Sequence, residues 1–196
     1  GRTVIIVESQ SSAGGNSVRA TGGMNAADTP YQDTNEFGEA AGVEKTLAAA
    51  EKYADHAEIQ KLASEVKAQW EAYQASPEGY FDSVELMELD TLIGGKGTND
   101  PELVETLAEN SADSIEWLSS IGADLKNVAQ FGGASVKRIH RPVNDEGKTV
   151  SVGSYLVPIL EKNVEDAGVE IMYETTATKI IMKDGKAAGI EATGKT

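Results

Sequence analysis

The stretch Thr3-Val4-Ile5-Ile6-Val7-Glu8 combines a continuous β-branched run with a terminal carboxylate. Such a short, non-alternating apolar run is typical of a parallel strand that is buried on both faces. Asn16 follows eight residues after Glu8, with Gly14-Gly15 before it and Gly22-Gly23-Met24-Asn25 after it. An acidic residue at the carboxyl end of the second strand of a dinucleotide fold accepts hydrogen bonds from ribose hydroxyls. Glycines let backbone N–H groups approach a ligand closely. The stretch therefore predicts a bound nucleotide cofactor.

The glycine fingerprint that accompanies such a strand, G-x-G-x-x-G, belongs on the strand and helix just before it. Only Gly1 and Arg2 precede the run here. We therefore expect the chain to be part of a longer protein, so that any signal peptide would lie upstream. The compartment stays open between the cytoplasm and the bacterial cell envelope.

Composition excludes several classes of function. The formal net charge of −15 disfavours nucleic acid and anionic membranes as partners, because both attract cationic surfaces. Cysteine is absent, which excludes disulfides, thiol catalysis and cysteine-ligated metals, and we expect no metal ligands. No run of 18 apolar residues occurs, so direct membrane insertion is not expected. A length of 196 residues suits one large domain or slightly more.

The middle of the chain has helical periodicity. Residues 27–42 are polar and turn-rich, and residues 43–54 are alanine-rich. From Asp55, with Glu58 three residues later as in a capping box, apolar side chains recur on one face of a helix; they are Ile59, Leu62, Val66, Trp70 and Tyr73. A further helix is expected over residues 83–93. Asp100-Pro101 predicts another helix, which continues to Gly122.

The end of the chain returns to an α/β pattern. Residues 123–150 lose the helical periodicity. A helix over 154–166 followed by a strand over 169–173 suits a parallel βαβ return. Residues 178–192 predict a hairpin around Asp184-Gly185, a favoured two-residue turn. The expected fold class is α/β: part of a doubly wound, Rossmann-like domain with an inserted helical lobe and a C-terminal hairpin.

Six motifs in order carry a resemblance to a known family. They are Val7-Glu8, Gly14-Gly15-Asn16-Ser17, Ala20-Thr21-Gly22-Gly23-Met24-Asn25-Ala26, Asn99-Asp100-Pro101-Glu102-Leu103-Val104, Trp117 to Leu125, and Gly132-Gly133-Ala134-Ser135-Val136 through His140-Arg141-Pro142. Together they resemble the flavoprotein subunit of the soluble fumarate reductase family, which includes urocanate reductase and flavocytochrome c. The resemblance covers almost the whole chain. The chain differs from the flavocytochromes in an extra helical segment near residues 50–95, which is longer here than in those proteins.

The resemblance implies FAD as the cofactor and assigns residues to it. Glu8 would hold the adenosine ribose, and Asn16 and Ser17 would contact the pyrophosphate and ribityl region. Gly22 and Gly23 would lie against the isoalloxazine.

The resemblance also implies a substrate contact. The backbone of Gly22 would border a bound dicarboxylate, and the main chain of Ala177 would contact the adenine. The proton-donating arginine and the carboxylate clamp lie further along in the family, so no catalytic residue is assigned. We expect residues 1–196 by themselves to be inactive.

The resemblance divides the chain into four parts. Residues 1–42 and 151–196 belong to the FAD-binding domain, 43–121 form an inserted helical lobe, and 122–150 form a loop region bordering the active-site cleft. The implied activity is reduction of an activated C=C bond, fumarate to succinate, by hydride transfer from flavin. This chemistry serves bacterial anaerobic respiration and requires an electron donor that the sequence does not identify.

Alternatives remain at each level. The substrate could be urocanate or another acrylate-type molecule, and the chain could instead be a non-catalytic helical interaction module. An NAD-type Rossmann dehydrogenase is disfavoured, because a helical lobe this large directly after the second strand is unusual there. Glu8 could be a solvated carboxylate, and Gly22-Gly23 could be a plain turn. His140 could serve acid–base chemistry, although local hydrogen bonding is the simpler interpretation.

Overall fold

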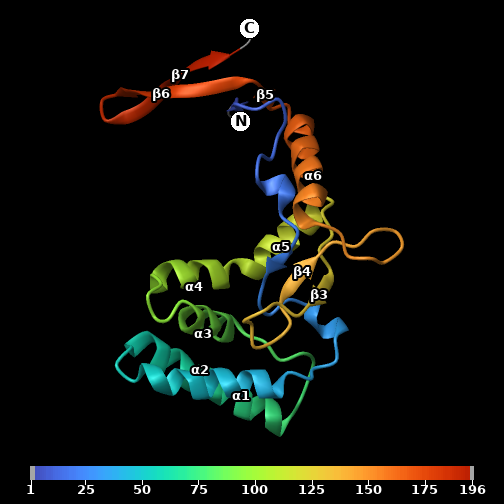
Figure 1. Cartoon of the computed structure of the whole chain (residues 1–196), viewed down its shortest axis with the longest axis vertical. Coiled ribbons are helices and arrows are strands. Elements are labelled where there is room, and N and C mark those ends of the chain that lie inside the picture. The colour runs from blue at the N-terminus through green and yellow to red at the C-terminus, as the bar shows by residue number, and fades with distance from the viewer. Residues whose placement is uncertain (1–2, 195–196) are drawn as a thin grey trace. The chain divides into compact units, whose positions relative to one another are not determined.

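The computed structural model describes residues 3–194, which divide into two compact units (Figure 1). The first unit comprises the chain up to Thr21, Ile121–Ala123 and the chain from Ser151 onward. The second unit comprises Gly22–Ser120 and Asp124–Val150. Each unit is described by itself below. None of the helices within residues 3–194 has the length and apolar character needed to cross a membrane.

The first unit contains the parallel strand pair that the sequence predicts, but the expectation that the strand is buried on both faces is wrong: Val4 is 50% and Ile5 53% exposed, because the sheet has only two strands within residues 3–194. Strand β1 (Ile5–Val7) pairs in parallel with β5 (Glu170–Met172), with Ile6 opposite Ile171. Helix α6 (Val152–Asp166) packs on the short 3-10 helix η1 (Ser17–Arg19). It ends at Asp166, and Gly168 shortly after it has a φ of +73°, which suits a residue without a Cβ. The βαβ interpretation of the chain end is therefore confirmed.

Strands β6 (Thr175–Lys183) and β7 (Lys186–Gly194) form the expected antiparallel hairpin. Asp184 and Gly185 both have positive φ, +50° and +74°. This is the backbone that a two-residue hairpin turn of type I′ requires, so the turn is confirmed as well.

The second unit is mainly helical. Its helices are α1 (Ala40–Ala50), α2 (Ala57–Ala75), α3 (Val84–Gly94), α4 (Pro101–Glu109) and α5 (Ser111–Ser120), with short 3-10 turns η2 (Gln32–Thr34) and η3 (Glu51–Tyr53). Its core forms where α1, α2 and α3 meet. Four of the five apolar positions predicted for α2 are buried in it, and Tyr73 packs at its edge.

Two helix boundaries differ from expectation. The cap of α2 is His56, whose Nδ1 accepts from the backbone N–H of Ile59 at 3.3 Å. The helix predicted from Pro101 to Gly122 is two helices, interrupted at Asn110. The Ser111 hydroxyl stabilises this break, because it donates to the carbonyl of Ala108 at 2.8 Å and accepts from the N–H of Ala27 at 3.1 Å.

A small antiparallel sheet accompanies the helices. Its strand order is β2 (Met24–Asn25), β4 (Ile139–Arg141) and β3 (Asn127–Ala129). Met24 lies opposite His140, and Val128 lies opposite His140 on the other side. The glycine segment that begins at Gly22 is thereby fixed to the His140 strand.

Candidate cofactor site

Glu8 directly follows β1, and its backbone is fixed on both sides. Its N–H donates to the carbonyl of Met172 at 3.0 Å, and its carbonyl accepts from the N–H of Thr175 at 2.9 Å. The side chain is exposed, and Oε1 accepts from the N–H of Gln10 at 2.6 Å and from the Ser9 hydroxyl at 3.3 Å. Oε2 has no hydrogen-bond partner among residues 3–194, so this carboxylate can accept further hydrogen bonds.

The loop after Glu8 forms a cavity of about 450 Å³. Most of the side chains that line it carry hydrogen-bonding groups. The lining residues are Gln10, Ser11, Ser12, Ala13, Gly15, Asn16, Val18 and Arg19. The Arg19 guanidinium forms no ion pair with any described residue. Asn16 stands at the N-cap position of η1, but its side chain makes no capping bond.

The two glycines of this loop have different roles. Gly14 has a φ of +95°, and a Cβ there would come within 2.7 Å of Cγ1 of Val157 on α6. Gly14 therefore allows the loop to pack on the helix. Gly15 has a φ of +47°, and nothing lies within 4 Å of the position its Cβ would take. This leaves open space beside the backbone of Gly15.

The donor set fits a nucleotide. A guanidinium, two serine hydroxyls and an amide are groups that bind phosphate oxygens, and a carboxylate with a free oxygen accepts from ribose hydroxyls. The residues of the first unit therefore suit the FAD that the sequence analysis expects. Arg19 was missed at the sequence level; the available signal was that it is the one basic residue of residues 3–20.

Ala177 lies on the exposed part of β6, in the same unit. The bond from the Thr175 N–H to Glu8 places the start of this strand beside the end of β1. The pairing of β6 with β7 shifts register between Ala177 and Lys179. The first unit thus contains Glu8, Asn16, Ser17 and Ala177, and their contact with FAD stays a prediction.

Gly22 and Gly23 belong to the second unit, and only one of them is sterically constrained by the protein. A Cβ on Gly23 would lie 2.3 Å from the carbonyl oxygen of His140 and 2.7 Å from Cγ of Arg141. A Cβ on Gly22 would meet only Cδ1 of Ile139, at 3.9 Å. Gly23 is therefore required by the close approach of its backbone to β4, whereas Gly22 leaves space in which a ligand can lie.

His140 is fully buried, and both of its ring nitrogens have partners. Nδ1 lies 2.9 Å from the carbonyl oxygen of Arg138, and Nε2 lies 2.7 Å from the hydroxyl of Thr29. Because a carbonyl only accepts, Nδ1 carries the proton and Nε2 accepts from Thr29. Burial lowers the pKa of His140, so its ring is neutral at pH 7. This geometry supports the local hydrogen-bonding interpretation.

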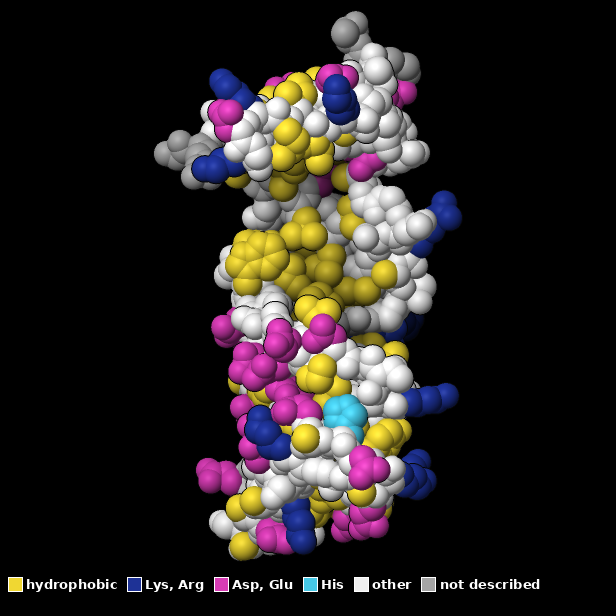
Figure 2. Space-filling model, turned by 90° about the vertical axis from the view of Figure 1, so that its left-hand side faces the viewer, with side chains coloured by type: hydrophobic (Ala, Val, Ile, Leu, Met, Phe, Trp, Pro, Cys, Tyr) yellow, Lys and Arg dark blue, Asp and Glu magenta, His cyan; other side chains and the backbone are white. Residues whose placement is uncertain are grey.

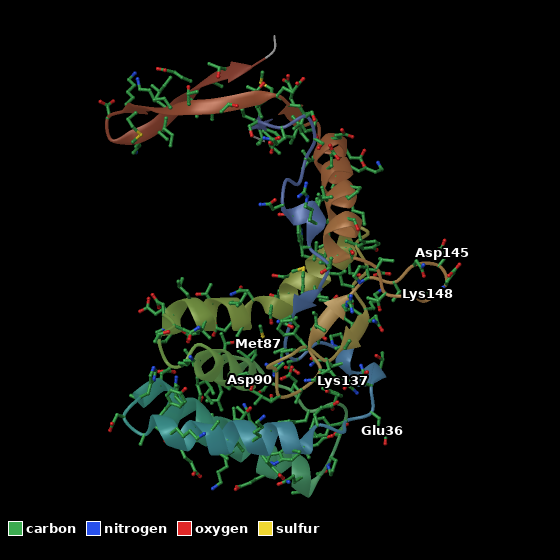
Figure 3. All side chains as sticks on the ribbon, in the orientation of Figure 1. Glu36, Met87, Asp90, Lys137, Asp145 and Lys148 are labelled. Carbon is green, nitrogen blue, oxygen red and sulfur yellow. The ribbon has the colours of Figure 1, made fainter. Side chains whose placement is uncertain are left out.

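A buried ion network joins Arg138, just before β4, to Asp82 and to Asp90 of α3; Figure 3 labels Asp90 and Lys137, the neighbour of Arg138. The guanidinium of Arg138 donates to both carboxylate oxygens of Asp82, at 2.6 and 3.2 Å, and to Oδ2 of Asp90 at 2.9 Å. Ser135 and Gln32 supply further donors to these carboxylates. Because every charge is paired and hydrogen-bonded, the network is structural rather than reactive.

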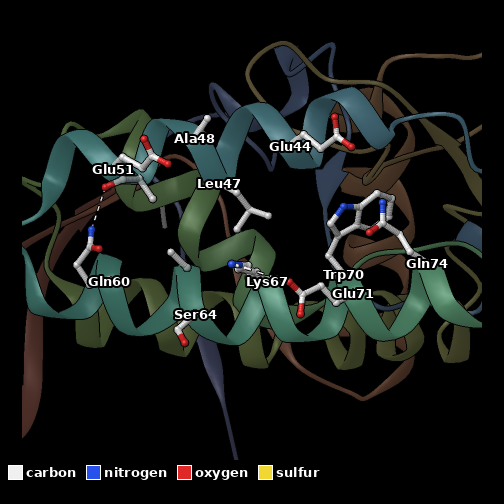
Figure 4. Close-up of a pocket in the computed structure, with 12 residues that line it drawn as sticks. Glu44, Leu47, Ala48, Glu51, Gln60, Ser64, Lys67, Trp70, Glu71 and Gln74 are labelled. Carbon is white, nitrogen blue, oxygen red and sulfur yellow. Dashed lines mark hydrogen bonds and ion pairs between the residues drawn. The ribbon is translucent and has the colours of Figure 1, made fainter.

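The second unit also contains a cavity of about 580 Å³ between α1 and α2 (Figure 4). Leu47 and Trp70 contribute apolar surface, and Glu44, Glu51 and Glu71 contribute carboxylates. None of the predicted site residues lines it. No group of His, Asp or Glu within residues 3–194 is arranged to hold a metal ion.

Comparison with known proteins identifies the family. The model of the family described as FAD binding domain matches residues 1–81 and 70–196. The fumarate reductase (cytochrome) of Shewanella frigidimarina is 31% identical over 99% of this chain and 26% of its own length. The NADH:acrylate oxidoreductase of Vibrio harveyi is 32% identical over 98% of this chain and 20% of its own length. The chain thus spans only about a quarter and a fifth, respectively, of the length of these two relatives.

Solved structures agree with the fold. An open conformation of a flavocytochrome c3 fumarate reductase superposes with a TM-score of 0.63, at 28% identity, over 97% of this chain and 27% of that one. A 3-ketosteroid-Δ4-(5α)-dehydrogenase from Rhodococcus jostii, at 19% identity, reaches 0.62 over 97% of this chain and 37% of that one and shows the same fold. The chain therefore belongs to the FAD binding domain family, which implies FAD as its cofactor.

Proposed function

We propose that this chain provides part of the FAD site of a flavoprotein that reduces an activated carbon–carbon double bond, with fumarate as the prototype substrate. The observation that carries the proposal is Glu8 at the carboxyl end of a parallel strand, with Oε2 unpartnered among residues 3–194. A phosphate-compatible loop follows it directly. The similarity to fumarate and acrylate reductases supports the reaction class.

Each residue of the site has a proposed role. Glu8 accepts from the adenosine ribose hydroxyls, and the backbone of Ala177 contacts the adenine. Asn16 and Ser17 donate to the pyrophosphate and ribityl groups, and the cationic Arg19 adds charge neutralisation there. These roles need no rearrangement of the hydrogen bonds that fix the backbone of Glu8.

Gly22 and Gly23 are proposed to border the flavin, and the backbone of Gly22 is proposed to border the substrate as well. When bound and reduced by an electron donor, FAD would supply the hydride for one alkene carbon. The chain orients the cofactor through Glu8 and the 9–19 loop, and Gly22 leaves space for a planar molecule. An electron donor and a proton donor are required in addition, and no described residue is assigned to either role.

An acrylate-type substrate is the second candidate, because the acrylate oxidoreductase is as similar to this chain as the fumarate reductase is. Urocanate remains a third possibility of the same reaction class. Fumarate has two carboxylates and acrylate has one, so a site shaped for one should reduce the other more slowly. Comparing the rates at which the flavoprotein that carries this chain reduces each compound identifies the substrate.

The experiment that tests the cofactor site replaces Glu8 by Ala and measures FAD affinity through the change in flavin fluorescence. Hydrogen bonds to a charged acceptor contribute about 1.5–3 kcal/mol each. Loss of one or two of them predicts at least about tenfold weaker binding. The control is Glu170→Gln, an exposed carboxylate on the neighbouring strand β5, which leaves the affinity unchanged. Unaltered FAD affinity in Glu8→Ala would show that the ribose role is wrong.

The non-catalytic alternative makes a separate prediction. An interaction module without a cofactor would show no flavin absorbance in the protein that carries this chain. Stoichiometric FAD that is lost on Glu8→Ala but retained on Glu170→Gln excludes that alternative.

A further inference from the structure

His140 holds the glycine segment to the centre of the small sheet at two points. Its main chain lies opposite Met24 of β2 and approaches Gly23 so closely that no Cβ fits there. Its ring Nε2 accepts from the hydroxyl of Thr29 at 2.7 Å, across 111 residues of sequence. One residue of β4 therefore fixes both ends of the segment that runs from Gly23 to Thr29.

The chain between these two ends makes a sharp turn. Asp28 has a φ of +53°, a left-handed backbone that residues other than glycine adopt seldom. Hydrogen bonds fix the residues on either side of it. The N–H of Ala27 donates to Oγ of Ser111 at 3.1 Å, and Thr29 donates to His140. Such a backbone persists only when its surroundings hold it, so the bond from Thr29 to His140 helps to maintain the turn.

The ring of His140 is itself fixed and shielded from solvent. Its Nδ1–H and the N–H of Ala26 both donate to the carbonyl of Arg138, at 2.9 and 3.0 Å. Asp and Glu side chains gather on the face of the helical unit that Figure 2 shows, whereas His140 and Thr29 are buried, at 0% and 5% exposed. Because both partners are buried, solvent does not replace a hydrogen bond that a substitution removes.

We propose that His140 is a positioning residue, whose hydrogen bond to Thr29 sets where the backbone of Gly22 lies. The inference rests on the proposed function, in which Gly22 borders flavin and substrate. Little packs against Gly22 itself, since a Cβ there would meet only Cδ1 of Ile139, at 3.9 Å. Its position therefore depends on the residues after it, which β4 and the ring of His140 hold in place. His140 acts through this segment, because both of its ring nitrogens already have partners.

The test uses matched substitutions on both sides of the bond, in the flavoprotein that carries this chain. Thr29→Val removes the hydroxyl and keeps the branched shape, whereas Thr29→Ser keeps the hydroxyl. His140→Asn places an amide near the position of Nδ1, too short to reach Thr29. His140→Gln places an amide oxygen near the position of Nε2, where it can accept from the hydroxyl.

The variants without the bond are expected to be slow, and those that keep it are not. Misplacing a reacting group by about 1 Å costs about 100-fold in rate, so kcat for fumarate or acrylate should fall by about tenfold to 100-fold in Thr29→Val and His140→Asn. Thr29→Ser and His140→Gln should stay within about threefold of the unmodified protein by the same reasoning, because they keep the bond. FAD affinity, which the proposed function assigns to Glu8 and the 9–19 loop, should be equal in all four variants.

Hydrogen–deuterium exchange gives a readout that does not depend on activity. The N–H of Ala26 donates to the Arg138 carbonyl beside the ring, so its peptide should exchange at least about tenfold faster in Thr29→Val than in Thr29→Ser.

Unaltered kcat in Thr29→Val and His140→Asn would overturn the proposal. Equal losses in all four variants, or a loss matched by weaker FAD binding, would overturn it as well. If the unmodified flavoprotein reduces neither fumarate nor acrylate, the proposed function fails instead. Exchange then decides the role of His140, and equal exchange of the Ala26 peptide in Thr29→Val and Thr29→Ser would exclude it.

Discussion

Adding one methyl group at Gly23 is expected to destabilise the helical unit, whereas the same change at Gly22 is not. In Gly23→Ala the new Cβ would lie 2.3 Å from the His140 carbonyl oxygen and 2.9 Å from Cγ1 of Ile139. The nearest obstacle is backbone and cannot rotate away, so β2 must separate from β4. In Gly22→Ala the nearest atom is 3.9 Å away, an ordinary van der Waals contact.

The magnitude follows from the nature of the obstacle. Inserting atoms into a well-packed site costs about 1–3 kcal/mol, and a rigid main-chain oxygen places Gly23→Ala near the upper end. A loss of about 2–3 kcal/mol corresponds to a fall in Tm of roughly 5–10 °C for a chain of this size. Gly22→Ala is expected to change the free energy of unfolding by no more than about 0.5 kcal/mol.

Urea denaturation followed by tryptophan fluorescence reports on the correct unit. Trp70 and Trp117 both lie in the second unit, together with Gly22 and Gly23, and they are the two tryptophans of the chain. The midpoint of Gly23→Ala is expected well below that of the unmodified chain, with Gly22→Ala close to it. Equal midpoints for the two variants, or a larger effect at Gly22, would refute the packing argument.

Three further predictions concern charge and the site. Arg138→Met leaves Asp82 and Asp90 buried without their cation, so the free energy of unfolding in urea should fall by about 3–5 kcal/mol. Burial raises the pKa of Glu88 from 4.5 in the unfolded chain to about 7 in the folded chain. Its protonation therefore stabilises the fold at pH values below 4.5, and this stabilisation is lost as the pH rises to about 7. Glu88→Gln should therefore flatten the dependence of Tm on pH between 4.5 and 7, and an unaltered slope would contradict the assignment. In the flavoprotein that carries this chain, Gly22→Val should abolish alkene reduction while circular dichroism stays unchanged, and an active variant would exclude flavin or substrate contact at Gly22.

Local signals in the sequence predicted much of the fold. The apolar run before Glu8 forms a parallel strand, and Asp100 caps α4 by accepting from the N–H of Glu102, with Pro101 at the first helical position. The Asp184-Gly185 turn has the expected positive φ values. Each of these signals acts within a few residues, where backbone sterics and hydrogen bonding depend on the side chains nearby. They could therefore be interpreted without knowledge of the tertiary contacts.

Contacts between distant residues decided the rest. The break between α4 and α5 depends on Ser111, whose partner Ala27 lies 84 residues away. The sheet of β2, β4 and β3 has strands of two or three residues, too short for an alternating pattern to be recognised. Gly23 excludes a side chain because of the strand 116 to 118 residues further along, 139–141.

The same division holds for the candidate site. Glu8 and the glycines could be selected from sequence because strand-end carboxylates and glycine loops have known chemistry, whereas Asn16 and Ser17 were assigned through the family resemblance. Arg19 became a candidate only when the loop brought it into the cavity with Ser11, Ser12 and Asn16. Glu88 differs from the exposed glutamates because the packing of α3 against α2 and α4 leaves the residue only 8% exposed. Sequence specifies local geometry and residue chemistry, whereas burial and the pairing of distant charges arise only when the helices pack.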